Sequence, residues 1–403
     1  MNKKILIICS QYANDASGIC IQNISKVFLK QGALIYVISE KKQKKELKIK
    51  TKGIKIFYIK SHGGLISNKK RTIGRVIRLV KSGFSTFTYP NVAPIRSRKI
   101  IKLSKQLIKE NSIDCVIGVY RPYEAIKAVI KLKKIFKEKI KAITYHLDLI
   151  QEPSNTSKII RKYKIWRGRK ALDKELKMID MMLAPESAEK ILRKNQKVKY
   201  VDFPLYIKDI IEKNSGYEFS NEFINLSYVG SLDENNRNPK YALELFNEYN
   251  KKADKKIKLH IWGNLFGERL LALFDKYDFI CYNGIIENSF VQDVLKRSDF
   301  LLNISNKITF NMVPSKIFQM FCVKKPVINF ISNENDYSIR YYDMAKNSLN
   351  ITEYEKDLQR DLILLQNNII NYVNKFIDID DELFIKSTPE YTVNLINDCV
   401  TEE

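Results

Sequence analysis

The first half of the chain alternates short apolar runs with segments whose apolar residues recur at helical spacing. The helical segments cover about 21–31 and 123–136. The apolar runs predict these strands: KKILIICS (3–10), ALIYVIS (33–39), IKIFYIK (54–60), IDCVIGVY (113–120), KAITYHLDLI (141–150), MMLAP (181–185) and KYVDFP (199–204). Strands that alternate with helices predict a parallel, doubly wound α/β sheet.

The second half repeats this alternation. Its predicted strands are NLSYVGSL (225–232), KIKLHIWGN (256–264), FICYNGII (279–286), FLLNIS (300–305) and KPVINFI (325–331). Helical segments separate them, and two further helices are expected at 355–377 and 388–400. A chain of 403 residues is too long for one ordinary core. We therefore predict two Rossmann-like domains, 1–205 and 206–385, facing across a cleft, with a helix at 386–403 crossing back towards the first domain. Ligands of such sheets bind at the carboxyl ends of the strands.

Composition excludes several classes of protein. With 45% hydrophobic residues the chain can bury packed cores, unlike a disordered protein. No run approaches the ~18 apolar residues of a membrane-spanning helix, and MNKKILIICS lacks the features of a secretory signal. None of the six cysteines forms a C-x-x-C pair, and the three histidines are scattered. We therefore expect a cytosolic protein with reduced thiols and no metal.

Charge divides the chain unevenly. Residues 1–200 hold 47 Lys+Arg and 14 Asp+Glu, a net +33, whereas residues 201–403 hold 23 and 31, a net −8; the sum is the overall +25. A lysine-rich genome explains many lysines but not their confinement to one half. The asymmetry predicts an anionic partner for the first half, either nucleic acid or an acidic membrane surface.

Four motifs follow one another in the second half. They are V-G-S-L-x-x-x-x-R-N-P (229–239), H-I-W-G-N (260–264), Y-N-G-I-I (282–286) and P-S-K-I-F-Q-M-F-x-x-x-K-P-V-I (314–328). Their order and spacing resemble the donor domain of GT-B glycosyltransferases, and more narrowly the large retaining family of bacterial nucleotide-sugar transferases that build polysaccharides and glycolipids. The resemblance covers about 220–335, and residues 1–40 match more loosely. It implies the GT-B fold and a nucleotide-diphosphate sugar as donor.

The resemblance also implies a diphosphate site. Basic side chains and backbone N–H groups can stabilise a diphosphate leaving group without a metal. The family pattern places Arg237, which follows the strand ending near Gly230, and Lys316, behind Ser315, at this group. A lysine at a helix start opposes the helix dipole, which favours a bound anion. The alternatives are a solvated loop arginine and an ordinary first-turn lysine. Ser231 stands where many members have another arginine.

Two positions depart from the family pattern. Where members usually have two glutamates eight residues apart, this chain has Asn311 and Gln319. The resemblance implies that Asn311 contacts the transferred sugar and that Gln319 binds the ribose hydroxyls, since an amide both donates and accepts hydrogen bonds. The alternative is a chain that has lost catalytic activity.

Three residues of the first domain are further candidates. Gly18 lies in the loop after the first strand, where a missing side chain lets the backbone approach a phosphate or an acceptor. His146 and Asp148 end a predicted strand, and the resemblance implies that a residue near them contacts the sugar or the acceptor. A simple turn glycine and a structural histidine remain open alternatives.

Residues 69–84 predict an amphipathic helix in the basic half. Arg71, Arg75 and Arg78 lie opposite an apolar face. This arrangement fits an anionic membrane interface, where similar glycosyltransferases dock to reach lipid acceptors. The alternative is an apolar face in the core with solvated arginines.

The resemblance implies a metal-independent, retaining glycosyltransferase of the hexosyltransferase type. Its expected acceptor is lipid-linked or a cell-surface polysaccharide, and its expected location is the cytoplasm, peripheral at the inner face of the cell membrane. Two other functions remain open. One is a non-catalytic GT-B subunit that binds a glycan or a partner protein, supported by Asn311 and Gln319; the other is a nucleic-acid-binding protein, although no nucleic-acid motif is present.

Overall fold

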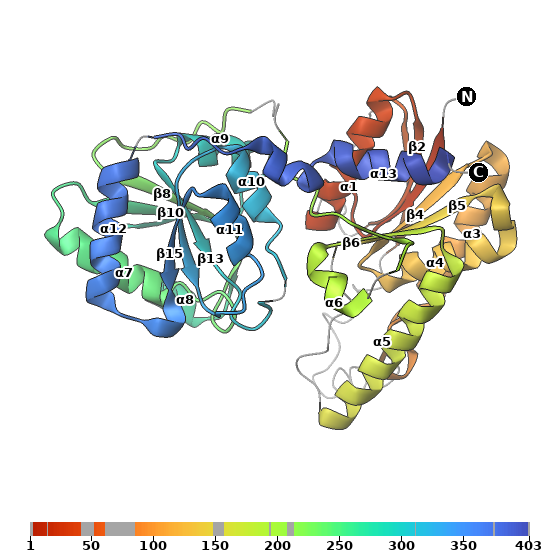
Figure 1. The fold of residues 1–403 in the computed structure, drawn as a ribbon, viewed down its shortest axis with the longest axis horizontal. Helices are drawn as coiled ribbons and strands as arrows, with labels where there is room; N and C mark the ends of the chain where they lie inside the picture. The colour runs from red at the N-terminus through yellow and green to blue at the C-terminus, as the bar shows by residue number, and fades with distance from the viewer. Residues whose placement is uncertain are drawn as a thin grey trace. The chain divides into compact units, whose positions relative to one another are not determined.

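The chain folds into two compact units. The computed structural model describes residues 3–13, 15–41, 52–60, 85–147, 157–192, 195–207, 213–310, 312–373 and 375–401. Unit 1 comprises Met1–Pro204 with Lys386–Glu403, and unit 2 comprises Leu205–Ile385. Each unit contains a parallel sheet flanked by helices, which confirms the predicted α/β class (Figure 1).

Unit 1 is built on a seven-stranded parallel sheet in the order β3-β2-β1-β4-β5-β6-β7. The strands are β1 (Lys4–Ile8), β2 (Leu34–Lys41), β3 (Ile54–Lys60), β4 (Cys115–Tyr120), β5 (Lys141–His146), β6 (Met181–Ala184) and β7 (Val198–Tyr200). Every residue of β4 and β6 is buried. Uninterrupted apolar runs of this kind are typical of strands that helices cover on both faces.

The helices of unit 1 include a segment from the far end of the chain. They are α1 (Ala16–Lys30), α3 (Pro94–Asn111), α4 (Tyr123–Phe136), α5 (Lys158–Met178), α6 (Glu189–Leu192) and α13 (Pro389–Thr401). Figure 1 shows α13 beside α1. Asn397 on α13 accepts a hydrogen bond from Lys3 Nζ at 3.1 Å and donates one to Gln31 Oε1 at 2.9 Å. The C-terminal helix therefore belongs to the same core as the N-terminal strand.

Unit 2 is built on a six-stranded parallel sheet in the order β12-β10-β8-β13-β14-β15, beside a two-stranded sheet of β9 and β11. The strands are β8 (Ile224–Val229), β9 (Leu232–Asp233), β10 (Ile257–Trp262), β11 (Leu265–Phe266), β12 (Ile280–Tyr282), β13 (Phe300–Ile304), β14 (Val327–Ile331) and β15 (Ser348–Thr352). The helices are α7 (Lys240–Lys252), α8 (Arg269–Phe274), α9 (Val291–Arg297), α10 (Lys316–Cys322), α11 (Ile339–Ala345) and α12 (Leu358–Tyr372). Figure 1 shows α7 and α12 on one side of the sheet and α10 and α11 on the other.

The helical tail differs from the sequence prediction in one respect. The predicted helix 355–377 is shorter in the structure, because α12 begins at Leu358 and ends at Tyr372. Asp357 sets its start: the carboxylate accepts hydrogen bonds from the backbone N–H groups of Gln359 (3.1 Å) and Arg360 (3.0 Å). An aspartate that caps free N–H groups marks a helix beginning more strongly than apolar periodicity does.

Several predicted features fall outside the described residues. These are the helix at 69–84 with Arg71, Arg75 and Arg78, and the candidate site residues Asp148 and Asn311. Within the described ranges, no helix combines the length and the apolar character needed to cross a membrane.

Candidate functional site

The candidate site lies where the strand order of unit 2 reverses. From β8 the chain adds β10 and β12 on one side of the sheet and then β13, β14 and β15 on the other. At such a switch point the following helices lie on opposite faces and leave a crevice beyond the carboxyl ends of the two central strands, where ligands bind. The loops that follow β8 and β13 therefore border the site.

A tight turn after β8 positions Arg237. Asp233 Oδ1 accepts hydrogen bonds from the backbone N–H groups of Asn235 (2.8 Å) and Asn236 (2.9 Å). The backbones of Asp233 and Arg237 also pair in both directions, at 3.1 and 3.0 Å. An aspartate that binds its own backbone two and three residues ahead stabilises a turn. Arg237 thus has a fixed backbone at the carboxyl end of β8.

Asn306 connects this turn to the loop after β13. Its Oδ1 accepts hydrogen bonds from Arg237 Nε (2.7 Å) and from Asn236 Nδ2 (3.2 Å). Asn306 is 2% exposed, and its Nδ2 donates to the Met312 carbonyl at 3.2 Å. Asn236 in turn accepts a hydrogen bond from the Ile308 N–H at 2.8 Å. Both loops are therefore held together by amide side chains that orient the Arg237 guanidinium.

Lys316 begins α10, close enough to Arg237 for their charges to interact. Its side chain reaches solvent, but protein atoms crowd the ammonium group. This desolvation, followed by the positive charge of Arg237, lowers the pKa of Lys316 to about 8. Two cations that repel each other at a strand-order switch form a site that an anion would stabilise.

Among the described residues, no carboxylate neutralises these two cations. Neither Arg237 nor Lys316 is in any ion pair of this part of the chain. Asp336 is within electrostatic range of Arg237, but its Oδ1 accepts hydrogen bonds from Ser338 N (2.8 Å) and Oγ (2.7 Å). Burial raises the pKa of Asp336 despite these bonds and the arginine, which reduces its value as a counter-charge.

Gln319 lies one turn after Lys316 on α10, so the two residues share a face of the helix. Its Nε2 is 3.5 Å from Asn288 Oδ1, at the edge of hydrogen-bonding distance, and its carbonyl accepts from Gln292 Nε2 at 3.3 Å. The Gln319 amide is half-buried. It is therefore only weakly held by the described residues and retains the capacity to bind a ligand.

Gly230 has a structural explanation beside its predicted role, whereas Ser315 has none. Ser315 precedes α10 with helical dihedral angles, and its side chain makes no capping hydrogen bond to the helix. A Cβ added to Gly230 would lie 2.9 Å from the hydroxyl of Tyr228. Gly263 approaches the Gly230 carbonyl so closely that a Cβ there would be 1.8 Å away, and its φ of +143° also favours glycine. Donor binding by Ser315 and Gly230 stays a prediction.

In unit 1, His146 is engaged with a carboxylate. The ring is 3% exposed, its Nε2 lies 2.6 Å from Glu175 Oε1 on α5, and it stacks on Tyr120 at 5.3 Å between ring centres. Glu175 itself is fully buried. This pair ties β5 to α5. The structure thus favours the structural alternative for His146, and its catalytic role stays a prediction.

Gly18 makes room for its own loop. A Cβ at this position would lie 1.7 Å from the Gln11 carbonyl oxygen, so the glycine permits the loop after β1 to fold against the first turn of α1. Asp15 caps this turn by accepting from the Gly18 N–H at 2.7 Å. The predicted contact of Gly18 with a donor remains a prediction.

Sequence reasoning missed Asn236, Asn306 and the turn at Asp233. A signal for the turn was present in the sequence Asp-Glu-Asn-Asn that begins at Asp233. An aspartate followed by polar residues often starts a turn. The position of Asn306 directly after a buried strand was a weaker signal. Within the described ranges, no three His, Cys, Asp or Glu side chains gather as they would around a metal ion.

Comparisons with known proteins concern the fold. No protein-family model and no curated protein sequence matches the chain. Among solved structures, the chain is similar to the lipopolysaccharide outer core galactosyltransferase WaaB in its apo form, at 16% identity over 98% of this chain and 99% of that chain, with a TM-score of 0.54. It is similar to WaaG, a glycosyltransferase involved in lipopolysaccharide biosynthesis, at 10% identity over 97% and 99%, with a TM-score of 0.56.

A third similar structure carries another activity in its description. It is a putative UDP-N-acetylglucosamine 2-epimerase from Listeria monocytogenes, at 11% identity over 99% of this chain and 96% of that chain, with a TM-score of 0.55. All three likenesses span both units and nearly the full length of each chain. The GT-B fold predicted from the sequence is therefore confirmed: the chain has the fold of the GT-B glycosyltransferases.

Proposed function

We propose that the chain is a retaining glycosyltransferase that moves a sugar from a nucleotide-diphosphate donor to a lipid-linked or cell-surface polysaccharide acceptor. The donor diphosphate binds Arg237 and Lys316 without a metal, and Gln319 binds the ribose of the nucleotide. The protein works in the cytoplasm, peripheral at the inner face of the membrane. The lipopolysaccharide enzymes WaaB and WaaG, which share its fold, support an acceptor of this class.

One observation carries this proposal: two cations that have no carboxylate partner among the described residues lie at the strand-order switch of unit 2. Arg237 is oriented by Asn306, at 2.7 Å, and its charge helps to lower the pKa of Lys316 to about 8. A bound diphosphate would relieve the repulsion between them. It would also accept charge-assisted hydrogen bonds, which are stronger than neutral ones.

The residues of this site act on the leaving group. As the bond between the anomeric carbon and the diphosphate oxygen breaks, negative charge grows on the diphosphate, and Arg237 and Lys316 stabilise that charge. The acceptor oxygen forms the new bond on the same face of the sugar, and its proton passes to a phosphate oxygen of the leaving group. The products are a nucleoside diphosphate and a glycoside with retained configuration.

Two measurements test the proposal. A thermal-shift screen with UDP, GDP, CDP and ADP identifies the base, because a nucleotide that binds only the folded state raises Tm. Radiolabelled nucleotide-sugars with the selected base, in the presence of EDTA, then report transfer or hydrolysis. We expect a Tm increase with one nucleotide and turnover that survives EDTA. The absence of any nucleotide binding would contradict the proposal.

A second candidate function is epimerisation of the sugar on its nucleotide. The epimerase structure matches this chain as well as the two transferase structures do. Chromatography of the labelled donor separates the outcomes, since an epimerase returns an isomer of the donor and releases no nucleoside diphosphate. Nucleotide binding with neither product would favour a non-catalytic GT-B subunit, the alternative that Gln319 supports.

A further inference from the structure

Unit 1 contains a cavity that the proposed transfer reaction does not use. It has a volume of about 390 Å³ and lies between α4, α5 and residues 87–94. Its walls combine aromatic and aliphatic side chains, among them Phe87, Tyr89 and Ile130, with four cations: Lys127, Arg167, Lys170 and Lys174. None of the described residues that line it is an aspartate or a glutamate. The size is within the range of small-ligand pockets.

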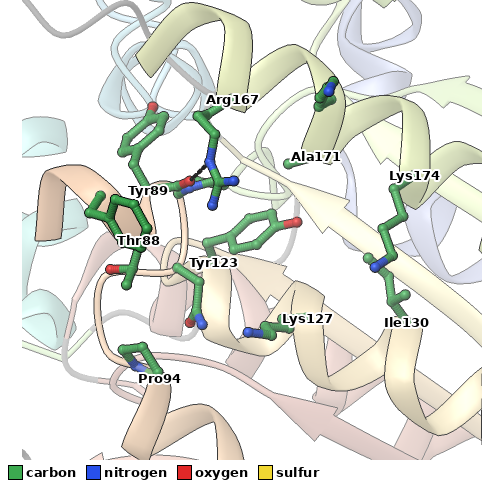
Figure 2. A pocket seen from close by; sticks show the side chains of 13 residues that line it. Thr88, Tyr89, Pro94, Tyr123, Lys127, Ile130, Arg167, Ala171 and Lys174 are labelled. Atoms are coloured by element: carbon green, nitrogen blue, oxygen red, sulfur yellow. Dashed lines mark hydrogen bonds between the residues drawn. The ribbon is translucent and has the colours of Figure 1, made fainter. Parts of the chain in front are cut away.

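The cations face a shared space. Figure 2 shows Lys127 from α4 and Arg167 and Lys174 from α5 around the ring of Tyr123. Arg167 is held in place because its Nε donates a hydrogen bond to the Tyr89 carbonyl at 3.0 Å. Desolvation, and after it the charge of Lys174, lowers the pKa of Lys127; the charge of Glu124 partly offsets this, and Arg98 and Arg167 add to the lowering. These charges therefore repel one another across the cavity.

The nearby carboxylates are already engaged. Glu124 on α4 accepts hydrogen bonds from Arg96 Nη2 at 2.6 Å and from the Ala93 N–H at 2.7 Å. Glu175 on α5 pairs with His146 at 2.6 Å. In the part of the chain that the structure describes, Lys127 and Lys174 have neither a hydrogen bond nor an ion pair. A ligand that enters this cavity would have to bring its own negative charge.

The apolar wall continues beyond the cavity along α5. Three apolar or aromatic residues and one lysine follow one face of this helix, at spacings of four, three and four residues: Ile159, Tyr163, Trp166 and Lys170. Ile159 is 81% exposed and Trp166 is 49% exposed. The Tyr163 hydroxyl donates to the Phe87 carbonyl at 3.2 Å, and Phe87 is 72% exposed.

This first part of the helix is also strongly basic. Residues 158–170 contain seven Lys and Arg and no acidic residue. Exposed aromatic and aliphatic side chains among cations are the features of a surface that lies in the interface of an anionic membrane.

We propose that this cavity binds the phosphate headgroup of an anionic membrane lipid, while the exposed stripe of α5 and Phe87 enter the interface beside it. The phosphate lies among Lys127, Arg167 and Lys174, and the start of the acyl region meets Phe87 and Tyr89. This inference rests on the peripheral membrane location proposed above and names the residues responsible. It does not depend on sugar transfer.

Flotation with vesicles tests the site. The full-length protein is mixed with vesicles of phosphatidylglycerol and phosphatidylcholine, or of phosphatidylcholine alone. The double variant Lys127→Glu, Lys174→Glu is compared with Lys26→Glu, Lys30→Glu, which makes the same charge change at exposed lysines of α1 that do not line the cavity. We expect the cavity variant to lose at least about tenfold in binding to the anionic vesicles and the control to lose less than about threefold. Equal losses would overturn the proposal.

Tryptophan emission gives a second readout. Trp166 is 49% exposed whereas Trp262 is 4% exposed, so a vesicle-induced blue shift reports mainly α5. We expect the shift with anionic vesicles, and its loss in the cavity variant. Binding of glycerol phosphate without vesicle binding would overturn the lipid assignment. Nucleotide titration of the same variants should be unchanged, so a failure of the lipid site and a failure of the donor site give different results.

Discussion

The two halves of the molecule hold their positive charge in different ways. Residues 1–200 carry a net +33, and the cations of the unit 1 cavity are one group among many on exposed helices. Residues 201–403 carry a net −8, yet Arg237 and Lys316 lie together at the switch point of the unit 2 sheet without a carboxylate partner among the described residues. Net charge therefore does not locate a specific anion site.

The surroundings of the cations make the difference. In unit 2, Asn306 and the turn at Asp233 orient one arginine, so a ligand meets a prepared geometry. In unit 1, Arg167 donates a hydrogen bond to the Tyr89 carbonyl and the Lys170 ammonium lies 4.2 Å from the centre of the Trp166 ring, whereas Lys127 and Lys174 have no hydrogen bond or ion pair among the described residues. A prepared site suits a defined small ligand, whereas lysines that no protein group orients suit a surface whose charges are not fixed in place. Each prediction below tests this contrast or one of the residues assigned to it.

The largest expected effect concerns His146, the unit 1 residue for which a structural role competes with a catalytic one. His146→Ala removes the partner of Glu175, whose carboxylate is fully buried, and should lower the free energy of unfolding by about 3–5 kcal/mol. Urea denaturation followed by circular dichroism measures this loss. His146→Gln keeps a side-chain amide that can donate to Glu175, so it should recover most of the stability.

The same pair of variants can reverse this interpretation. If His146→Gln is as stable as the natural protein but transfers no sugar, the histidine acts in catalysis and not only in holding α5 to β5. Unit 1 would then contribute a prepared catalytic group as well as a charged surface.

The next effect tests the prepared site of unit 2. Arg237→Ala and Lys316→Ala should each weaken nucleotide binding by about 1.5–3 kcal/mol, because each removes a charged contact to the diphosphate. By titration calorimetry this is a rise in Kd of about 10- to 150-fold. Lys240→Ala is the matched control, since this exposed lysine lies three residues after Arg237 and makes a long contact of 3.8 Å with Glu244. Unchanged affinity in both site variants would remove the basis for the diphosphate assignment.

Much of this arrangement could be predicted from local sequence patterns. Apolar runs located the strands of the two main sheets except β15, whose sequence SLNIT is too polar to stand out, and the order of motifs put Arg237 in the loops after β8 and Lys316 at the start of α10. That inference works because strand burial and helix periodicity are local properties. Asn306 was missed because its importance comes from a hydrogen bond to a residue 69 positions away.

The partner of His146 shows the same limit. Glu175 lies 29 residues further along the chain, on a helix whose register against β5 depends on packing. Periodicity indicates that α5 is a helix but not which of its residues meets a given strand. Gly18 is similar, since its close neighbour is a backbone carbonyl, which no side-chain pattern reveals.

A smaller effect is the pH dependence of nucleotide binding. The pKa of Lys316 is lowered to about 8, and a diphosphate stabilises the charged ammonium. The affinity for the nucleotide should therefore be highest below this pKa and fall as pH rises through it. Near this pH, binding should be accompanied by proton uptake at Lys316. Between about pH 7 and about pH 9 we expect Kd to rise about tenfold. Lys316→Arg should remove the dependence, because a guanidinium stays charged throughout; an unaltered pH profile in that variant would assign the titration to another group.

The smallest effect is expected at Gln319, where the chain departs from the carboxylate of similar enzymes. Its Nε2 is only 3.5 Å from Asn288 Oδ1, so little is lost in the protein when the amide changes. Gln319→Glu should preserve or raise transfer and alter Kd by less than about threefold, since a carboxylate accepts hydrogen bonds from ribose hydroxyls as an amide oxygen does. Gln319→Leu, similar in size but unable to bind a hydroxyl, should weaken binding by about 1 kcal/mol. If Gln319→Glu abolishes activity while Gln319→Leu does not, the residue faces the diphosphate charge and not the ribose, and the prepared site extends one helical turn further than Arg237 and Lys316.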